Sequence, residues 1–121
     1  MDYSSNSGVQ KRAYQFALSV ITIVDNLPVR GSAAVIGNQL LRSATSIGAN
    51  IIEAQAASSR KDFKNFLNHA LKSANETKYW LSLLRDSHKA ESGTIAPALK
   101  EASEIANILG ASIVTLKKKS E

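Results

Sequence analysis

The segment QLLRSATSIGANIIEA, Gln39–Ala54, carries apolar and polar side chains in a repeating order. Apolar residues recur every three or four positions and no proline interrupts them, which is typical of an amphipathic helix. On a wheel of ~100° per residue, with Ile36 at zero, the apolar stripe fills roughly 0° to 80°. The polar residues fall between about 240° and 340° on the same wheel, beside that stripe. They are Gln39, Arg42, Ser43, Ser46, Asn50 and Glu53.

A polar strip in this position lies where one helix meets its neighbour. Serine allows two backbones to approach closely, and Asn, Arg and Glu need partners when they are partly buried. Ser73 and Glu76 share a flank of the next predicted helix, where Glu76 can pair with Arg42. We interpret the strip, together with Ser73 and Glu76, as an inter-helix polar network that fixes the helix register. A site for a ligand or a partner is the alternative interpretation.

The same helix has a second apolar face between about 120° and 180° on the wheel. This face consists of Leu41, Thr45, Gly48 and Ile52. A helix with two apolar faces is either buried on both sides or shared with another subunit. In so small a bundle we expect a subunit contact, so these residues form a predicted oligomer interface. Gly48 costs roughly 1 kcal/mol relative to alanine in a helix, which suggests close packing or a slight bend there.

The remaining sequence repeats the helical spacing. Pro28 ends the first periodic segment, while Ser32, Ser59 and Thr94 are predicted N-caps and Pro97 fits the first turn of the last helix. The pattern predicts one domain, an all-α antiparallel up-down-up-down four-helix bundle. We expect helices at about 9–27, 33–57, 60–88 and 95–118, within a bundle at 9–118 that follows a flexible tail at 1–8.

Composition narrows the class of protein. The 121 residues include no cysteine, which excludes disulfides and thiolate metal sites. The N-terminus is polar, and no run approaches the ~20 apolar residues that span a membrane. We therefore expect a soluble, cytoplasmic protein with no membrane contact.

Basic residues dominate the charge, with a formal net charge of +5 and a pI of about 9.6. Several gather on the third predicted helix, within an arc of about 140°. We interpret this arc as a candidate surface for RNA or DNA phosphates, with a merely solvated helix face as the alternative. Tyr79 and Trp80 lie on the same helix but form no interleaved aromatic platform. The arc consists of Arg60, Lys61, Lys64, Lys72, Lys78, Arg85 and Lys89.

The sequence lacks the residue patterns that are typical of enzymes. No glutamate has a histidine three positions later, so the di-iron pattern of helical bundles is missing. His69 and His88 have no second ligand at metal-binding spacing. The sequence also lacks a glycine-rich phosphate loop and a nucleophile motif. We expect no catalytic residue, no metal site and no cofactor.

The run Gln39–Ala54 resembles the signature of the 23S rRNA intervening-sequence proteins, also called S23-type ribosomal proteins. In that family Gln-Leu-Arg-Arg-Ala leads into Ser-Ile-Pro-Ala-Asn-Ile-Ala-Glu-Gly. A Phe-x-x-Phe-Leu-x-x-Ala-x-x-Ser-x-x-Glu run then follows, which is similar to Phe63, Phe66, Leu67, Ala70, Ser73 and Glu76.

This chain departs from the family pattern at three positions. Leu41 replaces a second arginine, Gly48 a proline and Ala54 a glycine. The missing arginine weakens any case for phosphate contact by the polar strip. The resemblance, which covers about Val9 to Leu116, implies a homopentamer of bundles. It also implies kinship with the accessory variability proteins of diversity-generating retroelements, which are basic, barrel-shaped nucleic-acid binders.

Charge and resemblance together favour a non-enzymatic, oligomeric, basic bundle that binds RNA or DNA through backbone phosphates. The alternative is a structural or protein-interaction scaffold, with an oligomeric surface that holds a protein partner and a basic arc that serves solubility.

Overall fold

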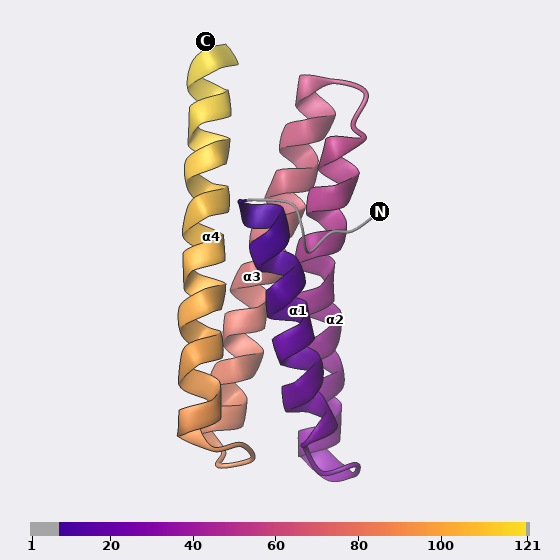
Figure 1. Cartoon of the computed structure of the whole chain (residues 1–121), viewed down its shortest axis with the longest axis vertical. Coiled ribbons are helices and arrows are strands. Elements are labelled where there is room, and N and C mark those ends of the chain that lie inside the picture. The colour runs from indigo at the N-terminus through magenta and orange to yellow at the C-terminus, as the bar shows by residue number, and fades with distance from the viewer. Residues whose placement is uncertain (1–7, 121) are drawn as a thin grey trace.

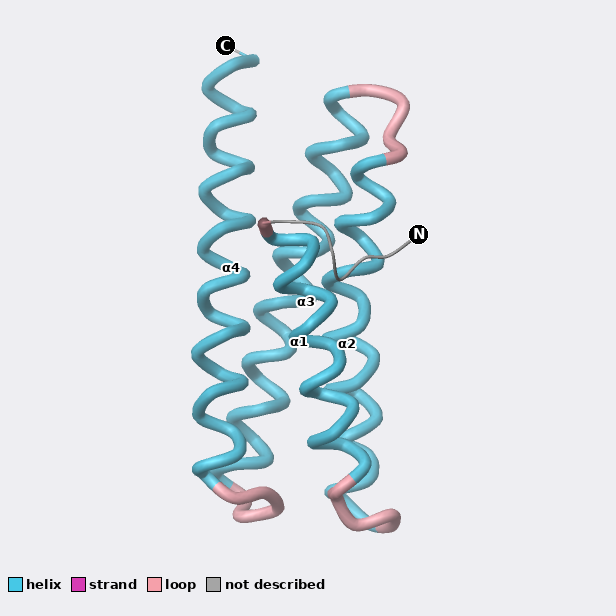
Figure 2. Tube along the Cα trace, viewed as in Figure 1, coloured by secondary structure: helices cyan, strands magenta, loops and turns pink. Residues whose placement is uncertain are grey.

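The computed structural model describes residues 8–120 and confirms the predicted all-α fold (Figure 1). Successive helices run in opposite directions and pack on each other, and α1 also packs on α4, which closes the bundle. No strand occurs within residues 8–120 (Figure 2). The predicted tail at 1–8 falls outside the described residues except for Gly8. The helices are α1 (Val9–Asp25), α2 (Gly31–Gln55), α3 (Arg60–Asp86) and α4 (Ser92–Ser120).

The helix ends differ from the predicted ends by a few residues. Ser59 caps α3 as expected, since its hydroxyl accepts the Asp62 N–H at 3.1 Å. The other two predicted caps are wrong, because Ser32 lies inside α2 and Thr94 inside α4. Because α4 begins at Ser92, Pro97 lies in its second turn rather than its first.

The core is a continuous column of aliphatic side chains contributed by all four helices. Alanine occupies many of the positions between the larger side chains and allows the backbones to approach closely. The largest fully buried apolar residues are Val20, Leu40, Ile47, Ile51, Leu81, Leu84, Ile95, Ile105 and Leu109.

Unequal helix lengths leave one end of the bundle with three helices. α1 has 17 residues and α4 has 29, so α4 is longer by 12 residues. That difference is ~18 Å at 1.5 Å per residue. Figure 1 shows α2, α3 and α4 continuing beyond the start of α1. We call this the open end of the bundle.

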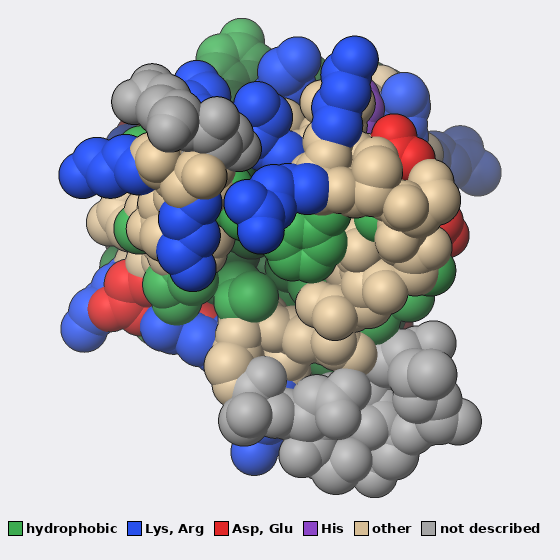
Figure 3. Space-filling model, turned by 90° about the horizontal axis from the view of Figure 1, so that it is seen from above, with side chains coloured by type: hydrophobic (Ala, Val, Ile, Leu, Met, Phe, Trp, Pro, Cys, Tyr) green, Lys and Arg blue, Asp and Glu red, His purple; other side chains and the backbone are tan. Residues whose placement is uncertain are grey.

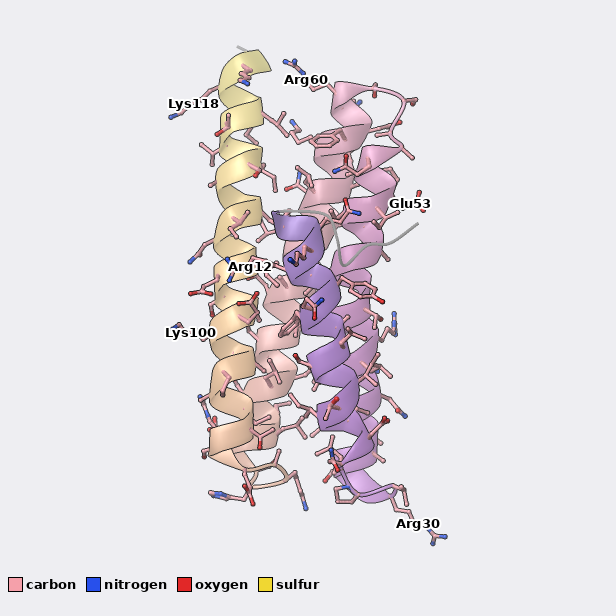
Figure 4. The ribbon with its side chains drawn as sticks, in the orientation of Figure 1. Arg12, Arg30, Glu53, Arg60, Lys100 and Lys118 are labelled. Atoms are coloured by element: carbon pink, nitrogen blue, oxygen red, sulfur yellow. The ribbon has the colours of Figure 1, made fainter. Side chains whose placement is uncertain are left out.

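Arg12 links α1 to α4 near the middle of the bundle (Figure 4). Its Nε donates to Glu101 Oε2 at 2.9 Å and its Nη2 to Glu101 Oε1 at 2.6 Å. The same Nη2 donates to Glu104 Oε2 at 2.5 Å. The hydrogen bond from Arg12 lowers the pKa of the Glu101 carboxyl below its ordinary value.

This pairing makes the stability of the fold depend on pH. Because the pKa of Glu101 is lower in the folded state, its carboxylate stabilises the fold at pH values above its unfolded-state pKa of ~4.3. This stabilisation is lost as the pH falls through the folded-state pKa. Glu101→Gln should therefore lower the free energy of unfolding by about 1 kcal/mol at neutral pH and by much less near pH 3. Urea unfolding at both pH values tests this, with the exposed Glu91→Gln as control. A loss for Glu101→Gln that stays the same at both pH values would contradict the assignment.

Two glycines inside helices should respond differently to alanine. A Cβ at Gly110 has no heavy atom within 4 Å, whereas one at Gly37 would lie 2.9 Å from Leu27 Cδ1. Gly110→Ala should raise the free energy of unfolding by about 1 kcal/mol through helix propensity alone. Gly37→Ala should gain less, or lose stability, because buried Leu27 must move. Equal gains in the free energy of unfolding, measured with urea, would show that the Leu27 side chain moves aside without cost.

Candidate nucleic-acid interface

α3 carries six of the seven predicted basic residues along one side. From Arg60 to Arg85 they extend over ~38 Å at 1.5 Å per residue. Lys89 does not continue this side, because α3 ends at Asp86 and His88 adopts a φ of 60°. We call the six residues on the helix the α3 basic face: Arg60, Lys61, Lys64, Lys72, Lys78 and Arg85.

The packing of α2 determines where this face points. α2 contacts the side of α3 that carries Ser73 and Thr77, so the basic face lies toward solvent and toward α4. Lys64, Lys78 and Arg85 are half-buried, and the other three residues are exposed. Lysine and arginine can lay their aliphatic stems along the bundle in this way while the charge stays in water.

Most of these cations have no counterion among the described residues. Within residues 8–120, Arg85 is the one member of the face in an ion pair, with its Nε 2.8 Å from Asp86 Oδ1. The hydrogen bond from Arg85 lowers the pKa of Asp86. The other five form no ion pair with any residue in that range, so their charge remains available to an external anion.

One aromatic ring lies on the same side of α3. Tyr79 is 58% exposed and falls at about the same wheel angle as Lys61 and Lys72. It packs edge-to-face on half-buried Trp80, with the ring centroids 5.1 Å apart. The Trp80 indole donates to Glu76 Oε2 at 2.9 Å. Trp80 therefore has a packing role, while the ring of Tyr79 is accessible to a stacking partner.

Hydroxyl groups join α2 to α3 behind the basic face. Ser43 and Thr77 are buried, and their oxygens lie 2.9 Å apart. The Thr77 hydroxyl also donates to the Ser73 carbonyl at 2.7 Å. The Ser43 hydroxyl also lies 3.2 Å from the Leu40 carbonyl. Because the Thr77 proton goes to Ser73, the single proton of Ser43 is shared between Thr77 Oγ1 and the Leu40 carbonyl. One turn away, the Ser73 hydroxyl donates to Ser46 Oγ at 3.0 Å.

The rest of the predicted polar network behaves differently. Asn50 donates to the oxygens of Ser46 on its own helix, at 2.9 and 3.0 Å. The predicted Arg42–Glu76 pair is wrong, because Glu76 accepts from Trp80 instead. Gln39, Arg42 and Glu53 make no side-chain hydrogen bond or ion pair with other residues of the 8–120 range. Thr77 could not be assigned to this network from the sequence, because it occupies a position in the apolar stripe of α3, opposite Ser43.

The predicted oligomer interface lies against α1. Leu41, Gly48 and Ile52 are half-buried, and the exposed Thr45 donates its hydroxyl to the Leu41 carbonyl at 2.8 Å. A groove of about 400 Å³ separates this part of α2 from α1. A Cβ at Gly48 would lie 3.7 Å from Ala13 Cβ, which is ordinary contact, so packing within the bundle does not require glycine there.

α1 extends this surface in a way that the sequence did not reveal. Tyr14, Leu18 and Ile21 are 38%, 45% and 40% exposed on its outer side. Their spacing of three and four positions places them on one helix face beside the α2 residues. We call the combined surface the α1–α2 apolar face: Tyr14, Leu18, Ile21, Leu41, Thr45, Gly48 and Ile52.

Residues 8–120 contain no candidate metal cluster and no candidate membrane span. No group of three or more His, Cys, Asp or Glu side chains there is arranged to hold a metal ion. None of the helices in this range combines the length and hydrophobicity needed to cross a membrane.

Known proteins resemble this chain in both sequence and structure. A crystal structure of a protein of unknown function from the S23 ribosomal protein family of Bacteroides thetaiotaomicron VPI-5482 is 38% identical, with a TM-score of 0.81. The similarity covers 88% of this chain and 98% of that one. No curated protein matches the sequence. Residues 5–111 match the 23S rRNA-intervening sequence protein family, and the chain belongs to that family.

Proposed function

We propose that this protein is a non-enzymatic, oligomeric bundle that binds RNA or DNA through backbone phosphates. The α3 basic face carries the proposal, since five of its cations form no ion pair within residues 8–120 and extend along one helix. Lysine and arginine in such an array can follow successive phosphates and displace condensed counterions. Contacts of this kind position a nucleic acid without reading its sequence.

The family descriptions indicate which nucleic acid to test first. The family description names an intervening sequence of 23S rRNA, and the similar crystal structure is described as one of the S23 ribosomal protein family. RNA is therefore the first probe, with DNA of equal length beside it. Tyr79 supports a single-stranded ligand, because an exposed ring next to lysines can stack on a base.

Oligomerisation through the α1–α2 apolar face would strengthen such binding. The face presents large apolar side chains from two adjacent helices, and a second copy would remove them from water. The family resemblance implies five copies. A pentamer would have a formal charge of +25, five times the +5 of one chain, and would repeat the basic face around its axis.

Charge reversal on α3 tests the nucleic-acid proposal. Lys72→Glu/Lys78→Glu should weaken binding of a single-stranded RNA by about tenfold or more and lower the salt slope by about 1.4. Lys11→Glu/Lys100→Glu is the matched control, because it changes net charge equally at exposed positions on α1 and α4. Fluorescence anisotropy over a salt series gives the affinities, and circular dichroism checks that both variants are helical.

Two results would contradict this proposal. Equal losses of RNA affinity in both double variants would show that only net charge matters. The α3 basic face would then be excluded as the binding surface. If the wild-type protein bound neither RNA nor DNA at low salt, the scaffold alternative would replace nucleic-acid binding.

A charged substitution in the α1–α2 apolar face tests the oligomer interface. Ile52→Glu should dissociate the assembly, because a carboxylate would be buried without a partner, yet the monomer should stay helical. Val35→Glu is the control, since Val35 is 63% exposed on another side of α2. Light scattering with size exclusion reports the masses. An intact assembly for Ile52→Glu, or a monomeric wild type, would refute the assignment.

A further inference from the structure

The open end of the bundle contains an apolar groove that nucleic-acid binding does not explain. It lies where α1 would continue if α1 were as long as α4 (Figure 1). Its volume is about 550 Å³. Apolar residues from all four helices line it, including Val9, Ile51, Phe63, Leu67, Ile108 and Leu116.

Cations lie near this groove at the open end of the bundle, although none of them lines it and Lys118 extends away from the other helices (Figure 4). Arg60, Lys61 and Lys64 begin α3, while Lys117, Lys118 and Lys119 end α4. Within residues 8–120, none of these six forms an ion pair. Figure 4 shows Arg60 extending from the start of α3 toward the end of α4. Seen from above, in Figure 3, lysine and arginine side chains lie beside apolar side chains at this end.

Within residues 8–120, few acidic side chains lie at the open end of the bundle. The Asp62 carboxylate accepts the Ser58 hydroxyl at 2.9 Å, and Asp62 N–H bonds to Ser59 at the start of α3. Glu53 extends away from the bundle in Figure 4. Within residues 8–120, the apolar floor of the groove therefore lies near a rim of cations that form no ion pair.

The part of α4 that extends beyond α1 is long enough to pack against a short helix. The 12 residues by which α4 exceeds α1 correspond to about three helical turns. A helix placed there would continue the line of α1 and complete a four-helix core at this end. Helix-in-groove recognition uses an amphipathic helix with apolar anchors at positions three and four residues apart.

We propose that this groove binds an acidic amphipathic helix from a protein partner. Apolar residues of that helix would cover Phe63, Leu67 and Ile108, and its carboxylates would face the lysines and arginines of the rim. Nucleic acid fits less well, because phosphates would pair with the rim and leave the apolar floor exposed. A second copy placed end-on also fits less well, because two basic ends would repel each other.

A synthetic peptide provides the test. The probe is a fluorescein-labelled, helix-stapled peptide of 14 residues with leucine at three- and four-residue spacing and glutamate elsewhere. Two control peptides have the same composition in scrambled order, or lysine in place of glutamate. Fluorescence anisotropy with the full chain should give a Kd of the order of 10 µM for the acidic amphipathic peptide, and binding at least about tenfold weaker for both controls.

Neighbouring residues of α4 supply matched protein variants. Thr115 is exposed and lines the groove, whereas Val114 is exposed and does not line it. Thr115→Glu should weaken peptide binding about tenfold, and Val114→Glu, with the same added charge, about twofold or less. Ile108→Glu should abolish binding, and its helicity and melting temperature are measured in parallel. Thr115→Glu keeps the test decisive if Ile108→Glu does not fold.

Several results would overturn this proposal. They are no peptide binding, equal binding of the scrambled peptide, and equal losses for Thr115→Glu and Val114→Glu. If Thr115→Glu reduced RNA affinity instead, or changed the oligomer mass, the groove would belong to nucleic acid or to another copy. Lys72→Glu/Lys78→Glu should keep its peptide affinity, which separates this proposal from nucleic-acid binding by the α3 basic face.

Discussion

Packing between α2 and α3 is the constraint on which the rest of the structure depends. These two helices share the largest contact in the bundle, and the buried Ser43–Thr77 pair lies within it. A hydroxyl buried without a partner costs free energy, so this pair penalises any rotation or sliding that separates the two oxygens. The Ser46–Ser73 contact repeats the restriction one turn away. Once α2 and α3 have this register, the directions of their outer faces are also determined.

As a result, the candidate binding surfaces lie on different sides of the bundle. The α3 basic face points away from α2, whereas the α1–α2 apolar face lies across α2 from α3. Subunits that associate through the apolar face would therefore leave the cations of α3 free to contact a ligand. At the open end, α1 is too short to fill its place, so apolar side chains lie next to the first cations of α3. Charge and apolar surface are combined at this end of the bundle.

Periodicity was sufficient to predict the helices, because an apolar stripe at helical spacing leaves few alternatives. The ends were less predictable, since capping depends on local backbone geometry: Ser32 and Thr94 have suitable side chains, yet both lie inside helices. Lys89 was assigned to α3 for the same reason, although His88 already leaves the helical conformation. The Arg42–Glu76 pair failed because a wheel gives angles and not distances, and Trp80 was a nearer donor to Glu76. The α1 part of the apolar face was missed because exposure depends on which neighbour covers a helix.

α1 has the weakest attachment of the four helices. It is the shortest, it packs on α2 and α4, and its contact with α4 is the smallest in the bundle. The Arg12 pairs supplement that contact with charge, which salt and acid both weaken. Stability in a folded chain is not uniform, and elements with few contacts open first. We therefore expect α1 to be the first helix to detach, and its detachment would expose the apolar side chains of α2 and α4 that it covers.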